Sequence, residues 1–248
     1  MTSQDTVTQS TQRPSFDIPL SFTVADKGLP QTIGAAEIAA QGWNVLAGDL
    51  PFPLAVLKQS ALRHNSHWMR SFLAASGVSL APHGKTTMAP KLFQQQIDDG
   101  CWGITVATAQ QAAVAAQHGI KRILIANQLV GRANITVILD LLRQDPTLDL
   151  YCYVDSAAGV EMLQAAVRDA QAQPLNVLLE IGFKGGRTGC RNQATIGQVL
   201  EALVAARPSL RLRGIAGYEG LITADAAATT EAAVITFLDQ MICDYRDV

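Results

Sequence analysis

The sequence lacks the features that mark several large classes of protein. It has no apolar run long enough to span a bilayer, and residues 1–13 are polar, without the basic start and apolar core of a signal peptide. Charged residues make up only 16% of the chain and the net charge is −2, so there is no basic surface to attract nucleic acid or an anionic membrane. We therefore expect a cytoplasmic protein that binds neither.

Cysteine pairs and the common phosphate-binding and hydrolase motifs are also absent. The four cysteines lie far apart and form no CxxC pair, so we expect neither a disulfide nor a cysteine metal site. No Walker loop, strand-linked GxGxxG, HExxH or nucleophile elbow occurs. His64 and His67 share one face of a predicted helix, but no further ligands can be placed beside them. We predict solvated histidines there and no metal site.

What the chain has is a regular alternation of apolar runs with helical stretches rich in Ala, Leu and Gln. At 48% hydrophobic residues it can bury a sizeable core. Helices are predicted over residues 60–75, 88–99, 109–118, 134–144, 157–172, 196–207 and from 230 to the end. Strands are predicted at 54–57, from 78, and at 103–107, 122–126, 148–154, 175–181 and 212–217. Strands separated by such helices imply right-handed crossovers and a parallel sheet.

The alternation predicts an α/β fold with a parallel sheet, and the resemblance described below implies that it is an incomplete (β/α)8 TIM barrel. From the strand at Val78 onward the chain supplies about six β/α units, whereas a closed barrel has eight. We expect a flexible segment at 1–30, a strand and helix leading into the barrel at 31–76, and the partial barrel at 77–248. An open sheet of this kind has an exposed edge, which invites pairing with another chain.

The candidate chemistry lies where the strand from Val78 ends. His83 and Lys85 are two residues apart, so extended geometry directs both side chains to the same side. The carboxyl ends of parallel strands are where α/β folds bind ligands. Lys85 is either an ordinary solvated charge or an amine partly withdrawn from water. In the second case its pKa falls and it can form a Schiff base with a carbonyl, with His83 relaying a proton.

The motif around this lysine resembles a known family. PHGKTTMAPK at residues 82–91, followed by WGITVAT at 102–108, resembles the D-serine dehydratase-like amino-acid deaminases. These are pyridoxal 5'-phosphate (PLP) enzymes that share the alanine racemase fold with the D-threonine aldolases. The resemblance runs from about residue 42 to the last residue. It implies that Lys85 binds PLP through a Schiff base and that the chain is a lyase converting a D-serine-like amino acid to a keto acid and ammonia.

Further candidate residues follow later strands. The glycine-rich basic turn at 182–191 carries Arg187, which the resemblance matches to an arginine facing the phenolic oxygen side of the cofactor. Tyr218 follows the next strand and either contacts the pyridine ring, as the resemblance implies, or is an ordinary amphipathic tyrosine at the barrel rim. Thr105 and Asn127 fall at strand ends and are candidates to line the same mouth.

The resemblance leaves several functions open. By the resemblance, relatives continue into further barrel strands and a C-terminal β domain that holds the metal ligands of some of them, and we expect this chain to be shorter than these relatives. Aldol cleavage of the D-threonine aldolase type and racemisation use the same fold. The sequence is also compatible with a non-catalytic PLP carrier, with a chain too short to hold PLP, and with a sugar-phosphate aldolase. Relatives have their active site at a dimer interface, so the resemblance implies a homodimer with a D-amino acid substrate.

Overall fold

The computed structural model describes residues 21–223 and 227–247. The chain divides into two compact units, Met1–Ser76 and Gly77–Val248. In the first unit, two short strands pair antiparallel and two 3-10 helices and one long α-helix follow them: β1 (Ser21–Phe22), β2 (Ile33–Gly34), η1 (Ala35–Gln41), η2 (Val45–Ala47) and α1 (Gln59–Ser76).

Two expectations for the first unit can be compared with its structure. The helix predicted at 60–75 is confirmed as α1, and His64 and His67 are exposed on it. The strand predicted at 54–57 is wrong, because the chain there has no regular structure and Val56 and Leu57 are 60% and 67% exposed. Residues 1–20 of the segment expected to be flexible lie outside the described residues.

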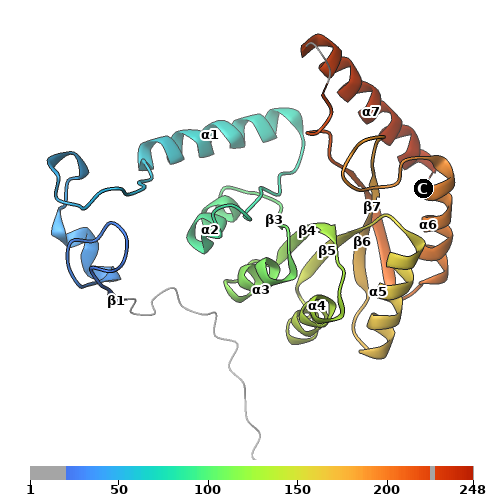
Figure 1. The fold of residues 1–248 in the computed structure, drawn as a ribbon, viewed down its shortest axis with the longest axis horizontal. Coiled ribbons are helices and arrows are strands. Elements are labelled where there is room, and N and C mark those ends of the chain that lie inside the picture. Colours follow the sequence, from blue (N-terminus) through green and yellow to red (C-terminus); the bar gives the residue numbers. More distant parts are fainter. Residues whose placement is uncertain (1–20, 224–226, 248) are drawn as a thin grey trace, which may run out of the picture. The chain divides into compact units, whose positions relative to one another are not determined.

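The second unit contains a five-stranded parallel sheet whose strands follow sequence order. Its strands are β3 (Ile104–Val106), β4 (Arg122–Gln128), β5 (Asp149–Val154), β6 (Leu175–Ile181) and β7 (Leu210–Gly217). Its helices are α2 (Pro90–Asp98), α3 (Ala109–Gln117), α4 (Arg132–Gln144), α5 (Ala157–Asp169), α6 (Gln193–Ala205) and α7 (Ala227–Asp247). All five strands were predicted, and the alternation forms the expected partial α/β barrel (Figure 1).

The two faces of this sheet differ in chemistry because successive strand residues point to opposite sides. On one face Ile125, Cys152 and Leu179 are at most 1% exposed and belong to the core that includes α3 to α6. Figure 1 shows these helices side by side along that face. The opposite face carries polar side chains, among them Asp149 and Asn176, which share a hydrogen bond of 3.0 Å. The helices therefore cover one face, and the polar face is left to form the barrel interior.

The strand expected from Val78 does not form as a regular strand, and in its place an extended segment lies beside β3 with one isolated bridge, from His83 to Thr105. Thr105 N donates to the Pro82 carbonyl at 2.9 Å, and Gly84 N donates to the Thr105 carbonyl at 2.7 Å. With this segment the count of about six β/α units holds. The expected burial is wrong at Val78, which is 55% exposed, because the segment borders the sheet. Its pairing with β3 is what positions the residues that follow it.

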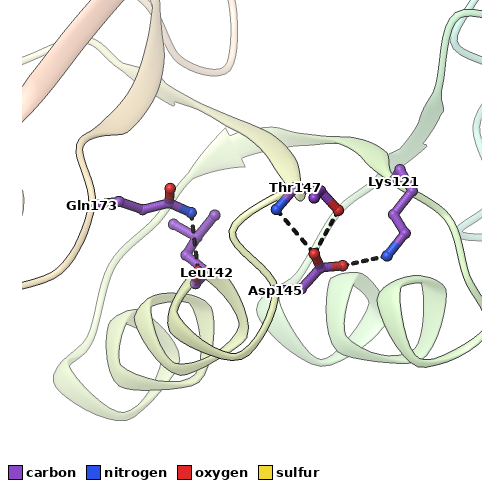
Figure 2. A network of polar contacts seen from close by, with 5 residues as sticks. All are labelled: Lys121, Leu142, Asp145, Thr147 and Gln173. Atoms are coloured by element: carbon purple, nitrogen blue, oxygen red, sulfur yellow. Dashed lines mark hydrogen bonds and ion pairs between the residues drawn. The ribbon is translucent and has the colours of Figure 1, made fainter. Parts of the chain in front are cut away.

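A polar network stabilises the turns at the opposite, amino-terminal ends of the strands. Asp145 pairs with Lys121, and its other carboxylate oxygen accepts from the Thr147 N–H at 3.0 Å and from the Thr147 hydroxyl at 2.6 Å (Figure 2). Gln173 Nε2 donates to the Leu142 carbonyl at 3.0 Å. The contacts with Lys121 and Thr147 lower the pKa of Asp145, chiefly through the hydrogen bond from Lys121. They belong to the end of the sheet that lies away from the candidate site.

Other expectations concern the chain as a whole. All four cysteines are free thiols. Among residues 21–223 and 227–247, no helix is long and apolar enough to cross a membrane. The same ranges contain no cluster of three or more side chains that could hold a metal ion.

Candidate active site

Lys85 lies in the turn between the extended segment and α2, directly after a tightly packed glycine. Gly84 is buried, and a Cβ atom at this position would lie 2.5 Å from Cε1 of Phe93, a fully buried ring. The chain can approach Phe93 this closely only without a side chain, so glycine is required here. The Lys85 side chain is exposed. Of the two alternatives for Lys85, this exposure agrees with a solvated charge and not with an amine withdrawn from water.

His83 lies within the electrostatic reach of two other candidate residues. Partial desolvation lowers the pKa of its imidazole below 6.5, and the positive charges of Lys85 and then Arg187 lower that pKa further. The ring is therefore neutral at pH 7 and can accept a proton.

The turn at residues 182–191, which carries Arg187, is fixed to the end of β6 by its backbone. Gly182 N donates to the Cys190 carbonyl, and Cys190 N donates to the Glu180 carbonyl, both at 2.8 Å. A Cβ atom on Gly182 would lie 2.2 Å from the carbonyl oxygen of Thr188. The glycine therefore allows the returning chain to pack directly on the strand end, and the turn is a defined structure that presents Arg187 to the site.

Arg187 and Tyr218 meet although they follow different strands. The guanidinium of Arg187 lies 5.5 Å from the centroid of the Tyr218 ring, and that tyrosine is 50% exposed. Both residues line a small recess together with Glu180 and Thr188. A guanidinium over an aromatic face is an attractive arrangement that limits the orientations of both groups.

Beneath Arg187, a buried carboxylate forms a hydrogen-bonded network. Glu180 is 4% exposed, its Oε2 accepts from Gln128 Nε2 at 2.5 Å, and its Oε1 accepts from the Thr188 hydroxyl at 2.9 Å. Burial raises the pKa of Tyr153 to about 12, the charge of Glu180 raises it as well, and the charge of Arg187 opposes the rise. Tyr153 is therefore a neutral phenol at pH 7.

The remaining two predicted site residues make local contacts. Thr105 is 4% exposed, and its hydroxyl donates to the Ala81 carbonyl at 2.7 Å, which ties β3 to the extended segment. Asn127 is exposed, and its Oδ1 accepts from the next backbone N–H at 3.0 Å. The side chain of Thr105 supports the segment before Lys85, and that of Asn127 lies against its own strand end.

Sequence reasoning did not select Gln128, Tyr153, Glu180 or Thr188, which complete the network. A signal for Tyr153 and Glu180 was present. In the strand DLYCYV at 149–154 Asp149, Tyr151 and Tyr153 alternate with apolar residues, and in LNVLLEI at 175–181 Asn176 and Glu180 lie four apart on one face. This period of two marks one polar face, and the residues nearest the carboxyl ends of that face are the ones at the site. Thr188 offered no such signal, because its role depends on the path of the turn.

Comparison with known proteins places this arrangement in a family. A family model for the N-terminal domain of alanine racemase matches residues 57–246. The chain belongs to this family. The match to the alanine racemase N-terminal domain includes the extended segment, the five-stranded sheet and all the candidate site residues.

Individual relatives agree with this assignment. The chain is 28% identical over 172 residues to a D-threonine aldolase from Arthrobacter sp, covering 68% of this chain and 44% of that protein. A D-threonine aldolase from Filomicrobium marinum has a similar solved structure, with a TM-score of 0.70, 25% identity, and coverage of 80% of this chain and 53% of that one. The solved structure of D-threo-3-hydroxyaspartate dehydratase from Delftia sp. HT23 is also similar, with a TM-score of 0.67 and 26% identity. The match covers 80% of this chain and 52% of that one.

A more distant structure shows the fold alone. Alanine racemase from Bacillus anthracis superimposes with a TM-score of 0.61 at 16% identity, covering 76% of this chain and 47% of that one. The chain thus spans about half the length of the relatives that it matches. These findings confirm the expected alanine racemase N-terminal fold and the similarity to D-threonine aldolase. The narrower D-serine dehydratase-like specificity stays a prediction.

Proposed function

We propose that this chain is the cofactor-binding part of a PLP-dependent lyase that acts on a β-hydroxy D-amino acid. The observation that carries the proposal is the contact of Arg187 with Tyr218 from two strand ends, together with the charges of Lys85 and Arg187 that both act on His83. Two of the similar proteins are an aldolase and a dehydratase, which are both lyases, and the names of both specify D-amino acids. Family membership and local geometry therefore point in the same direction.

The side chains at the site fit the chemical groups of PLP. A primary amine is needed to bind its aldehyde, and the exposed amine of Lys85 is accessible to it. A permanently charged planar donor suits its phenolic oxygen, and Arg187 is held over the Tyr218 ring near His83. An aromatic ring or phenol at Tyr218 suits the pyridine ring. We assign Lys85 as the attachment residue, with Arg187 and Tyr218 as further cofactor contacts.

When bound, PLP would withdraw electrons from the bond that is broken at Cα of the substrate. The residues of the chain have separate tasks. Lys85 would hold PLP through its amine and, when released by the substrate amine, would be available as a base for the proton at Cα. His83, two residues from Lys85, is neutral at pH 7 and would relay a proton at this site. The Tyr153 phenol keeps its proton at neutral pH, because burial raises its pKa to about 12.

Two reaction branches are compatible with this site. Loss of the β-hydroxyl group gives a keto acid and ammonia, and this is the branch that the PHGKTT motif favours by resemblance. Aldol cleavage between Cα and Cβ is the second candidate, favoured by the similarity to D-threonine aldolase. We propose the deaminating branch with D-serine or a similar substrate, and a homodimer as the functional form.

The branches can be separated by their products. The purified chain is loaded with PLP and given D-serine, D-threonine or D-threo-3-hydroxyaspartate, and ammonia, keto acid, glycine and aldehyde are measured. Ammonia and keto acid in equal amounts support deamination, whereas glycine and aldehyde identify aldol cleavage. Bound PLP with no product from any substrate would identify a PLP carrier, and a chain that does not bind PLP would contradict the proposal.

A further inference from the structure

Glu180 carries a carboxylate that is almost fully buried, although a carboxylate is costly to remove from water. It lies on the polar face of the sheet, near the end of β6, and is 4% exposed. A carboxylate in such a place needs hydrogen bonds on both oxygens to offset the loss of water. Both are present, and they come from different parts of the fold: one from Gln128 on β4 and one from Thr188 on the turn at 182–191.

These two contacts make Glu180 a tie between the sheet and the turn. Thr188 directly follows Arg187, so a restraint on its hydroxyl also restrains the backbone from which the guanidinium extends. The turn has a second anchor beside it, since Gly189 N donates to Asp155 Oδ2 at 3.0 Å. Hydrogen bonds to a charged acceptor are stronger than those between neutral groups, so an ionised carboxylate is well suited to this task.

We propose that Glu180 is a positioning residue: by accepting from Gln128 and Thr188 it holds the turn at 182–191 against the sheet and so sets the direction of Arg187 toward Tyr218 and the bound cofactor. This inference rests on the proposed PLP site, because it assigns a purpose to the orientation of Arg187. The first part of the inference, that Glu180 fixes the turn at 182–191, does not depend on PLP binding.

The test substitutes Thr188, because two replacements separate the effect of the side chain's shape from the effect of its hydrogen bond. Thr188→Val keeps the branched shape but removes the donor, while Thr188→Ser keeps the donor and loses only a methyl group. Hydrogen exchange of the Gly189 and Cys190 amides is measured on the full chain without PLP. We expect exchange about tenfold faster in Thr188→Val, equivalent to about 1.4 kcal/mol, and near wild-type exchange in Thr188→Ser.

The second measurement concerns the cofactor. Titration with PLP should give about tenfold weaker binding for Thr188→Val than for Thr188→Ser. The visible absorption band of bound PLP should also titrate with its midpoint at a higher pH in Thr188→Val. A displaced Arg187 guanidinium no longer lowers the pKa of the PLP group beside it. A loss of overall stability alone would not move this midpoint. Glu180→Gln, which keeps an acceptor oxygen but loses its charge, should fall between wild type and Thr188→Val in both measurements.

The outcomes are separable from those of the proposed function. If the wild-type chain takes up no PLP, the proposed function fails, while the exchange comparison still tests the tie. If amide exchange in the turn is the same in wild type, Thr188→Val and Glu180→Gln, the tie does not exist. Faster exchange with unchanged PLP affinity and an unchanged midpoint would contradict the positioning role.

Discussion

The guanidinium of Arg187 lies over the ring of Tyr218, 5.5 Å from its centroid. Arg187 comes from the turn after β6 and Tyr218 from the segment after β7, so this contact joins two neighbouring strand ends across the mouth of the partial barrel. Its attraction depends on the ring and not on the hydroxyl group.

Replacement of Tyr218 therefore separates the two parts of the side chain. Tyr218→Ala removes the ring and should weaken PLP binding by roughly two- to fivefold, as expected for about 0.5–1 kcal/mol at an exposed cation–π contact. Tyr218→Phe keeps the ring and should bind PLP like wild type in the same spectroscopic titration. Equal losses in both variants would show that the hydroxyl is the contributing group.

Gly84 predicts a packing effect beside the attachment lysine. Gly84→Ala forces a methyl group to within 2.5 Å of the buried Phe93 ring and should lower the free energy of unfolding by about 1–3 kcal/mol. Gly197 on α6 is the control, since a Cβ atom there meets nothing within 4 Å. Gly197→Ala should raise stability by up to about 1 kcal/mol in urea unfolding. A Gly84→Ala chain as stable as wild type would contradict the close packing of this segment.

The low pKa of His83 gives a prediction about pH. Since the positive charges of Lys85 and Arg187 contribute to the lowering, Lys85→Met or Arg187→Met should raise the pKa of His83 in an NMR titration. Arg191→Met is the matched control and should leave it unchanged. If neither Lys85→Met nor Arg187→Met moves the titration, these three residues are not together in solution.

The same group affects stability with a definite sign. Because the folded pKa of His83 lies below the unfolded value of 6.5, the unfolded chain binds more protons between those two pH values. The free energy of unfolding therefore falls as the pH drops below 6.5. The loss due to His83 is complete once the pH is below the pKa of His83 in the folded chain. Above pH 6.5 the contribution of His83 is absent.

Asp145 tests the network at the other end of the strands. Its pKa is lowered by Lys121 and Thr147, so it contributes stability above the unfolded value of 3.8 and loses it as the pH falls through the folded pKa. Asp145→Asn should cost about 1 kcal/mol or less at pH 7, since the pair is partly exposed. In urea unfolding the difference from wild type should shrink as the pH is lowered through 3.8. A difference that is constant with pH would exclude the ionic contribution.

The strands of the barrel could be predicted because each is a compact apolar run between helices of suitable length. β6, at Leu175–Ile181, has the predicted bounds, since all its helix-facing positions are aliphatic. The run at 54–57 looked equally apolar but remains irregular and exposed. A strand requires a partner as well as a pattern, and the local sequence carries no information about the partner.

The site could be predicted only where one short motif contained it. His83 and Lys85 lie in such a motif, and Arg187 and Tyr218 were carried by resemblance. The tie from Glu180 to Gln128 joins residues 52 positions apart, which no local pattern specifies. Asn127 was chosen for its place at a strand end, whereas the next residue, Gln128, is the one that reaches the network.

The assignment of Lys85 as the covalent attachment residue is tested most directly by chemical trapping. The purified chain is incubated with PLP, reduced with borohydride and digested, and the modified lysine is located by mass spectrometry. We predict a pyridoxyl group on Lys85 alone, and no label in Lys85→Ala. A label that persists in Lys85→Ala, or that is found on another lysine such as Lys91 or Lys184, would contradict the account.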